Sequence, residues 1–262
     1  MTTTASSTPA RSEIGYWVVM DAPVATERIA RHGYDYVCID AQHGLLDHRG
    51  VVSALMAVSA GGALGLSAGR KAPVGLVRVR ENSAGVISQA LDAGAGGVIV
   101  PMVDSPEDAR AAVAAVRYPP EGTRSYGPMR AVIRTGTDIA QINSGLRVYV
   151  MIESAEGLAN VEEIAATPGL SGLYIGPSDL TLAIGGTSST DAAVAAEFDT
   201  ALARITAAAR AAGIQVGIHT SGGAIARTRV EAGFDLVTVA CDLNHLDDAA
   251  ATHLEVAREG RA

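Results

Sequence analysis

The chain has little lysine, and this shortage excludes one kind of chemistry. Lys71 is the only lysine among 262 residues. It precedes an expected strand, so it lies at the end of a parallel sheet away from the end where active sites form. Schiff-base catalysis needs a lysine in the pocket. Carbon–carbon chemistry in this chain must therefore use a metal ion as its electron sink.

The chain also has few cysteines, no recognisable secretion signal and fewer positive than negative side chains. Cys38 and Cys241 are the only cysteines, which excludes a disulfide framework and predicts a reduced, cytoplasmic setting. The N-terminal MTTTASSTPARSE has no apolar core, so it is no secretion signal, and we count no apolar stretch long enough to span a bilayer. The net charge of −8 argues against nucleic acid or an anionic membrane as a partner.

Short apolar runs alternate with alanine-rich amphipathic stretches along most of the chain. The runs are apolar throughout, as expected for strands buried on both faces. The expected strands are 16–20, 36–39, 74–78, 97–100, 147–152, 172–175, 215–218 and 236–240. The expected helices are 24–32, 48–59, 83–93, 106–116, 155–166, 192–212, 222–232 and 243–258.

Eight strand–helix units in a chain of this length predict one (β/α)₈ TIM barrel, with a flexible tail over 1–13 and the barrel domain over 14–262. A doubly wound open sheet is the alternative, but no Gly-x-Gly-x-x-Gly turn follows the first strand. We interpret 61–69 as a flexible connection before the third strand. The irregular insert at 119–145 is long enough to suggest subunit contacts.

Two acidic residues stand at the far ends of neighbouring strands. Glu153 follows the run RVYVMI, and Asp179 follows GLYI through a Gly-Pro-Ser turn. Two like charges in one mouth need a cation or a shared proton, and carboxylates suit Mg²⁺ or Mn²⁺ first, with Co²⁺ or Zn²⁺ as alternatives. The other interpretation is that Glu153 caps the next helix and Asp179 starts another. The residues alone leave both open.

Other polar residues are expected at the same barrel face. Taken singly, Arg78 fits a structural ion pair, and His43 fits a surface loop. His219 ends the seventh strand. Because the carboxyl ends of barrel strands meet at one mouth, their joint placement favours an active site.

Three segments carry a resemblance to a known family. They are YVCIDAQHGLL (36–46), GAGGVIVPMVDSPEDARAAVAAVRY (94–118) with its Pro-Pro-x-Gly-x-Arg continuation, and 150–180 with its Ile-Gly-Pro-x-Asp-Leu motif. They resemble the HpcH/HpaI family of class II, metal-dependent pyruvate aldolases, which act on 4-hydroxy-2-oxoheptanedioate or 2-keto-3-deoxy sugar acids. The resemblance implies a pyruvate-type barrel and a homohexamer, a trimer of dimers, whose subunits exchange their last helices.

The resemblance also implies residue roles. Glu153 and Asp179 match the metal ligands, and Arg78 matches the arginine that contacts the pyruvate carbonyl. His43 matches the catalytic base, and Asp92 matches an acid paired with it across a subunit boundary. The backbone N–H groups of Gly176 and Ser178 match those that hold the pyruvate carboxylate.

The chain also departs from the family pattern. Gln42 replaces a glutamate before the catalytic histidine, Met151 replaces a glutamine near the substrate, and Tyr126 replaces a small apolar residue of the insert. His219 is an additional polar group at the mouth. We expect Met151 and Tyr126 to contact substrate and to alter the choice of acceptor.

The resemblance and these residues together predict a lyase that reversibly cleaves a 4-hydroxy-2-oxo acid to pyruvate and an aldehyde. His43, directly or through water, would take the C4 hydroxyl proton, and Arg78 would stabilise the pyruvate enolate. One alternative is an oxaloacetate decarboxylase that joins the same enolate to another acceptor, as macrophomate synthase does. A second is a metabolite-binding barrel without turnover.

Overall fold

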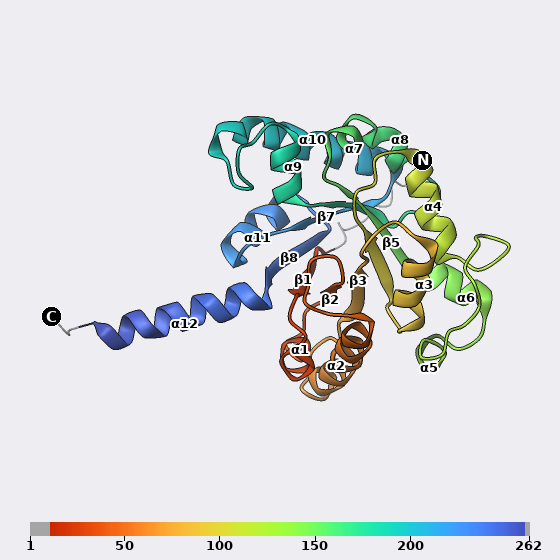
Figure 1. Ribbon diagram of the computed structural model, residues 1–262, viewed down its shortest axis with the longest axis horizontal. Helices are drawn as coiled ribbons and strands as arrows, with labels where there is room; N and C mark the ends of the chain where they lie inside the picture. The colour runs from red at the N-terminus through yellow and green to blue at the C-terminus, as the bar shows by residue number, and fades with distance from the viewer. Residues whose placement is uncertain (1–10, 260–262) are drawn as a thin grey trace, which may run out of the picture.

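The computed structural model describes residues 11–259, which form a closed barrel of parallel strands (Figure 1). Each strand pairs with the next along the chain, and β8 closes on β1. The strands are β1 (Glu13–Val18), β2 (Tyr36–Asp40), β3 (Val74–Arg78), β4 (Gly97–Val100), β5 (Arg147–Ile152), β6 (Gly172–Ile175), β7 (Gln215–His219) and β8 (Leu236–Cys241). The predicted (β/α)₈ barrel is confirmed. Of the predicted tail, residues 1–10 lie outside the described part, and Glu13 already belongs to β1.

Helices connect successive strands and cover the outside of the barrel. They are α1 (Pro23–Ala30), α2 (His48–Ser67), α3 (Ala84–Asp92), α4 (Pro106–Val116), α5 (Val132–Thr135), α6 (Ile139–Gly145), α7 (Ala155–Ala159), α8 (Val161–Ala165), α9 (Pro177–Ala183), α10 (Ala195–Ala212), α11 (Gly223–Glu231) and α12 (Asp242–Arg258), with a 3₁₀ turn at Ala192–Val194. The expected helix at 155–166 is divided in two at Asn160. The short helix α9 is absent from the expected helices, as are α5 and α6 within the insert. The alternative interpretation that Asp179 starts a helix agrees with its place in the first turn of α9.

Gly61, Gly62 and Gly65 lie in α2, which continues to Ser67, so the prediction of a flexible connection over 61–69 is wrong for all but its last two residues. A Cβ on Gly61 would lie 2.2 Å from the carbonyl oxygen of Glu27, so glycine allows α2 to pack closely on α1. The expectation that no apolar stretch could span a bilayer also needs correction, since α2 is long and apolar enough to do so by length and composition. Half of its apolar window is buried in the protein, which fits an outer helix of the barrel.

The inside of the barrel is filled by large side chains. Tyr36 and Tyr174 both hydrogen-bond the Thr238 hydroxyl, at 2.8 and 2.6 Å. Nine buried residues form this inner cluster: Trp17, Tyr36, Cys38, Leu76, Ile99, Tyr149, Met151, Tyr174 and Leu236. A second cluster lies between strands and helices. Because both faces of the sheet are buried, the strands are apolar throughout, and substrate can enter only at an end.

The insert between α4 and β5 lies at the N-terminal end of the barrel. Its arginines bind the end of α3: Arg130 donates to the Ala93 carbonyl at 2.6 Å and Arg134 to the Gly94 carbonyl at 3.1 Å. Lys71 also lies at this end, where it pairs with Asp35 at 2.9 Å. It is therefore remote from the mouth, as predicted.

The last helix does not fold back on the barrel. α12 extends away from the other elements (Figure 1), and every residue from Leu243 to Glu259 is exposed. Its start is anchored, because Asp242 accepts hydrogen bonds from the backbone N–H groups of Val19 and Met20 at 3.0 and 3.1 Å. The predicted exchange of this helix between subunits stays a prediction.

Candidate active site

A cavity of about 250 Å³ opens at the C-terminal ends of the strands. It brings together most of the residues that the sequence analysis selected. The lining residues are Trp17, Val19, Asp40, His43, Arg78, Met151, Tyr174, Gly176, Pro177, Ser178, Asp179, His219 and Cys241. Glu153 lies directly behind this wall, because a Cβ on Gly176 would come within 2.4 Å of its Oε2.

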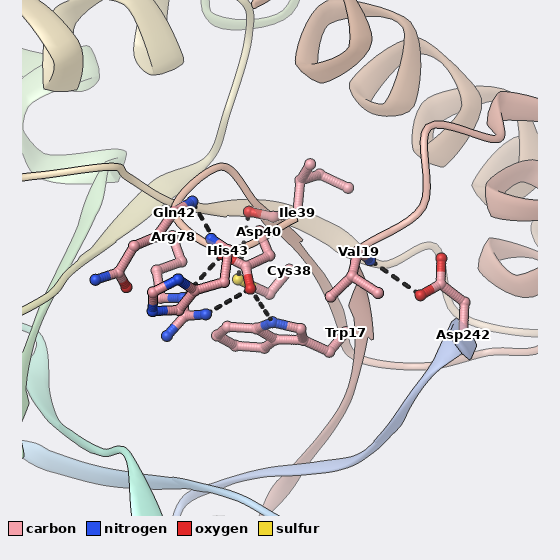
Figure 2. A network of polar contacts seen from close by, with 9 residues as sticks. All are labelled: Trp17, Val19, Cys38, Ile39, Asp40, Gln42, His43, Arg78 and Asp242. Atoms are coloured by element: carbon pink, nitrogen blue, oxygen red, sulfur yellow. Dashed lines mark hydrogen bonds and ion pairs between the residues drawn. The ribbon is translucent and has the colours of Figure 1, made fainter. Parts of the chain in front are cut away.

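One side of the mouth is organised around the carboxylate of Asp40 (Figure 2). Arg78 donates to it twice, from Nε at 3.0 Å and from Nη2 at 2.5 Å. Trp17 Nε1 donates at 3.1 Å, and the backbone N–H groups of Gln42 and His43 donate at 3.0 and 3.1 Å. The guanidinium of Arg78 also lies 5.2 Å from the centre of the Trp17 ring. Asp40 therefore fixes the arginine and the loop after β2 together.

The pairing keeps both groups charged despite their burial. Burial raises the pKa of Asp40, but the hydrogen bonds and positive charge of Arg78 outweigh it, so the pKa lies below its ordinary value. Burial lowers the pKa of Arg78, and the hydrogen bonds and charge of Asp40 raise it above its ordinary value. A fixed, always charged guanidinium beside a cavity can stabilise an oxyanion.

His43 is held by its backbone, and its side chain faces the cavity. The loop after β2 turns back at this point because Asp40 accepts the two successive N–H groups of Gln42 and His43. The ring is exposed and lines the mouth. This placement allows an imidazole to exchange a proton with a bound substrate.

The other side of the mouth carries the carboxylate pair. Glu153 is only 3% exposed and follows β5, while Asp179 lies in the first turn of α9 after β6. Glu153 Oε1 accepts the backbone N–H of Met102 at 2.8 Å. Burial raises the pKa of Glu153, and the negative charge of Asp179 raises it further. The hydrogen bond from the Met102 N–H lowers it, but the pKa stays above its ordinary value.

Met102 has an unusual backbone. Its φ of +51° is the only positive value of a non-glycine residue among residues 11–259. A left-handed conformation costs a non-glycine residue about 1–2 kcal/mol. Here it accompanies the N–H that points at Glu153, so the backbone of the β4–α4 loop orients this carboxylate.

The site meets one condition for a divalent cation. Glu153 Oε2 is buried and has no hydrogen-bond partner in the described part of the chain. A buried acceptor without a partner is costly, and a hard cation is the ligand that carboxylate oxygens take best. Within residues 11–259, no group of three or more His, Cys, Asp or Glu side chains is placed to hold a metal ion. The donor set therefore fits an ion that keeps waters and substrate oxygens, as Mg²⁺ commonly does.

Gly176 sits where no larger residue would fit. A Cβ at this position would also lie 2.9 Å from the Met151 Cε atom. The backbone at the start of α9 can therefore approach both the Glu153 carboxylate and the cavity. The N–H groups of Gly176 and Ser178 lie at this helix start, where the helix dipole favours anions.

Met151 and His219 line the cavity from neighbouring parts of the barrel. Met151 is buried within the inner cluster, as expected for an apolar wall beside Glu153. His219 at the end of β7 packs edge-on against Trp17, with ring centres 5.1 Å apart. Burial, followed by the positive charge of Arg78, lowers the pKa of His219 to about 4.

Two predicted site residues do not reach the cavity of their own chain. Asp92 ends α3, at the opposite end of the barrel, and pairs with Arg124 at 2.6 Å. Tyr126 is 60% exposed and packs on Tyr118, with ring centres 5.5 Å apart. Neither lines the cavity, so a contact of Asp92 with His43 or of Tyr126 with substrate needs a second subunit.

Sequence reasoning missed the importance of Asp40, Trp17 and Met102. A signal existed for Asp40, which is the only charged residue of an otherwise apolar strand. Its place beside Arg78 in the β2–β3 register comes from the structure. Trp17 gave no such signal, since an aromatic residue in an apolar strand normally belongs to the hydrophobic core. The backbone angle of Met102 cannot be read from residue types.

Comparison with known proteins gives a consistent result. The sequence model of the HpcH/HpaI aldolase/citrate lyase family matches residues 13–249. A hydroxypyruvate/pyruvate aldolase of Rhizorhabdus wittichii is 37% identical over 249 residues, which is 95% of each chain. A 5-keto-4-deoxy-D-glucarate aldolase of Citrobacter koseri is 36% identical over 236 residues, 89% of this chain and 87% of that protein.

Solved structures have the same architecture. The crystal structure of an HpcH/HpaI aldolase/citrate lyase family protein from Burkholderia cenocepacia has a TM-score of 0.85 and 34% identity, covering 95% of each chain. The citrate lyase beta subunit of M. tuberculosis, complexed with oxaloacetate and magnesium, has a TM-score of 0.54 and 20% identity, covering 89% of this chain and 92% of that one. This second similarity shows a shared fold alone.

Proposed function

The chain belongs to the HpcH/HpaI aldolase/citrate lyase family, and we propose that it reversibly cleaves a 4-hydroxy-2-oxo acid to pyruvate and an aldehyde. It is a carbon–carbon lyase whose substrates are a small 2-oxo acid and an aldehyde. The family is metal-dependent. The finer assignments below, of residue roles, metal and assembly, are our proposals.

One observation carries the proposal. A buried carboxylate oxygen of Glu153 lacks a hydrogen-bond partner among the described residues, and it lies directly behind Gly176 in the wall of the cavity that Asp179, Arg78 and His43 also line. Glu153 and Asp179 would hold the divalent metal. When bound there, the ion would polarise the keto group of the substrate and act as a Lewis acid toward the negative charge that develops on it.

The chain's own residues would orient the substrate. The N–H groups of Gly176 and Ser178 would bind the carboxylate of the 2-oxo acid, where the helix dipole supports a negative charge. Arg78 would donate a hydrogen bond to the C2 keto oxygen. Its direction is set by the two hydrogen bonds to Asp40, so no reorganisation is needed as charge develops.

His43 would move the proton that cleavage requires. Its ring would take the proton of the C4 hydroxyl, and the electrons of that O–H bond would form the aldehyde C=O. The electrons of the C3–C4 bond would pass to C2–C3, giving the enolate of pyruvate, whose oxyanion faces Arg78. Protonation of C3 then yields the methyl group of pyruvate. In the reverse direction His43 returns the proton to the new hydroxyl.

We propose Mg²⁺ or Mn²⁺ as the metal, with Co²⁺ or Zn²⁺ as the less suitable ions. Carboxylate oxygens without thiolate ligands favour the harder ions. His43 and His219 are the nearby nitrogen donors that a zinc site could use. Electron paramagnetic resonance can measure Mn²⁺ binding. Competition of each other ion with bound Mn²⁺ would then rank the affinities of the site for the four metals.

Deuterium exchange into the methyl group of pyruvate tests the function most directly. We expect exchange that depends on added Mg²⁺ or Mn²⁺ and stops in EDTA, because the enolate forms without any acceptor. Absence of exchange with every divalent ion would overturn the proposal. Comparing 4-hydroxy-2-oxo acids with oxaloacetate as substrates separates an aldolase from a decarboxylase.

We propose that a second subunit completes the site, in a homohexamer built as a trimer of dimers with exchanged α12 helices. Asp92 and Tyr126 would then act at the cavity of a neighbouring chain, with Asp92 paired to His43. Support comes from the exposed apolar residues of the extended α12: Leu243, Leu246, Leu254 and Val256. A single barrel leaves them without cover.

Subunit complementation tests this arrangement. His43→Ala and Asp92→Ala variants should each be inactive alone. If the pair forms across subunits, mixing and reassembly should restore about a quarter of the sites. Lack of recovery in mixed oligomers would remove Asp92 from the site that contains His43.

We also propose a cytoplasmic location. The two free cysteines support it, since neither is bonded in the structure and reducing compartments keep thiols free. Cell fractionation with an antibody to the chain would check it.

A further inference from the structure

His219 is the polar group of the cavity that the proposed mechanism does not use. It lies at the end of β7 and lines the mouth. Its ring contacts Trp17 edge-on, and within residues 11–259 it forms no hydrogen bond. No protein group among these residues therefore competes with a molecule in the cavity for the ring nitrogens.

The position of His219 fits the aldehyde half of the substrate. The wall formed by Met151, Gly176 and Asp179 serves the metal and the 2-oxo acid in the proposed function, and Arg78 serves the keto oxygen. The remaining wall comes from β7, β8 and β1, where Val19 and Cys241 accompany His219. In the proposed function, the aldehyde would occupy the space along this wall.

The state of the ring decides which groups it recognises. Burial and the nearby positive charge of Arg78 hold the pKa of His219 near 4, while the negative charge of Asp40 opposes them only in part. At neutral pH the ring is uncharged, with one N–H donor and one acceptor nitrogen. Such a ring suits a hydroxyl group, which can both give and receive a hydrogen bond. It offers no charge to attract a second carboxylate.

We propose that His219 determines specificity by hydrogen-bonding a hydroxyl group on the aldehyde, so that this chain prefers hydroxyaldehydes to unsubstituted aldehydes of the same size. The inference rests on the proposed function and names its acceptor class. An apolar acceptor would cover the half-buried imidazole without pairing its nitrogens, and sites built around a polar group reject analogues that lack its complement.

The test compares two acceptors of nearly equal size. Glycolaldehyde and propanal differ by a hydroxyl in place of a methyl group. We expect kcat/KM for aldol addition to pyruvate to favour glycolaldehyde at least about tenfold in the wild-type enzyme. His219→Leu should remove that preference, because leucine fills the space and cannot hydrogen-bond. A wild-type ratio near one, or an unchanged ratio in His219→Leu, would overturn the proposal.

Two further variants locate the active nitrogen. The amide of His219→Asn lies near the position of Nδ1, and that of His219→Gln near Nε2. One of the two should keep part of the preference for glycolaldehyde, and loss of preference in both with intact folding would contradict a hydrogen-bonding role. His32→Leu is the matched control, since His32 is exposed at the end of α1. It should keep the wild-type ratio.

The outcomes are distinct from those of the general proposal. If the protein is no pyruvate aldolase, the wild-type enzyme shows no metal-dependent deuterium exchange into pyruvate. If only the role of His219 is wrong, exchange occurs and the acceptor ratio fails to respond to the substitution. If the leucine variant does not fold, the wild-type ratio and the two amide variants still decide.

Discussion

The two sides of the mouth each contain a buried carboxylate, and the two differ in how many hydrogen bonds they accept and in the direction of their pKa shifts. Asp40, on the β2–β3 side, is 2% exposed and accepts hydrogen bonds from five donors. Glu153, on the β5–β6 side, is 3% exposed and accepts one, from Met102. Folding lowers the pKa of the first and raises that of the second.

This difference separates a positioning group from a ligand. The hydrogen-bonding capacity of Asp40 is taken up within the protein, so it fixes Arg78 and has little left for a ligand. Glu153 keeps a buried oxygen without a partner in the described chain, beside a second negative charge. A buried carboxylate without a partner destabilises the folded protein, and such a group is typical of a site where a bound cation supplies the missing contact.

The largest effect should come from removing the charge of Glu153. We expect Glu153→Gln to lower deuterium exchange into pyruvate at least about a thousandfold, since the amide cannot replace an anionic metal ligand. In EDTA the same variant should be more stable than wild type by about 1 kcal/mol, because a neutral group replaces an uncompensated buried charge. Exchange kinetics and urea unfolding measure the two changes. A less stable, fully active variant would remove Glu153 from the metal site.

Breaking the other side should lower both activity and stability. Asp40→Asn leaves the buried charge of Arg78 with a neutral partner. We expect kcat/KM to fall about a hundredfold as the guanidinium loses its orientation, and the free energy of unfolding to fall by about 3 kcal/mol. Steady-state kinetics and urea unfolding check these values.

An exposed ion pair provides the control for Asp40. Arg204 and Glu162 form a similar two-bond pair at 2.7 and 2.8 Å, but their side chains are 42% and 56% exposed. Glu162→Gln should therefore change stability by no more than about 0.5 kcal/mol. If Asp40→Asn is equally mild, burial of the Asp40–Arg78 pair is not what holds Arg78 in place.

The sequence predicted Glu153 better than it predicted Asp40, for a physical reason. A carboxylate after an apolar strand stands out, and the barrel brings the strand ends together. The role of Asp40 depends on a register that puts it beside Arg78, and on a loop that turns two N–H groups back toward it. These contacts form between segments distant in sequence, so residue types alone do not reveal them.

The barrel itself was predictable, and its exceptions follow from packing. All eight strands were expected because each is apolar on both faces. The helix at 61–67 was missed because glycine normally ends helices, whereas here the missing side chains allow close contact with α1. The position of Asp92 could have been predicted, since the end of a barrel helix lies opposite the mouth. The direction of α12 could not have been predicted, since its apolar residues could pack equally well on its own barrel or on a neighbouring subunit.

The backbone of Met102 offers a more selective test of the Glu153 side. Replacing the amide at residue 102 by an ester removes the N–H that donates to Glu153 and keeps the side chain. We expect Mn²⁺ to bind about tenfold more weakly, because partners of a metal ligand orient it. Calorimetry measures the affinity. Met102→Gly keeps the N–H and accepts a positive φ, so it should bind Mn²⁺ as wild type does; equal loss in both variants would assign the effect to the loop.

The smallest predicted effect is a pair of opposite pH dependences in the metal-free protein. Asp40, with a pKa below the ordinary 3.8, stabilises the fold above about pH 4, and this contribution is lost as the pH falls through its lowered pKa. Glu153, with a pKa above the ordinary 4.5, behaves in reverse. Its contribution is complete below about pH 4.5 and is lost as the pH rises through its raised pKa.

Thermal unfolding in EDTA should therefore show wild type losing stability relative to Glu153→Gln from pH 4.5 upward. Saturating Mn²⁺ should restore the stability of wild type at neutral pH. Parallel curves for the two proteins would mean that Glu153 is not destabilised by its burial, and the contrast between the two sides of the mouth would then rest on geometry alone.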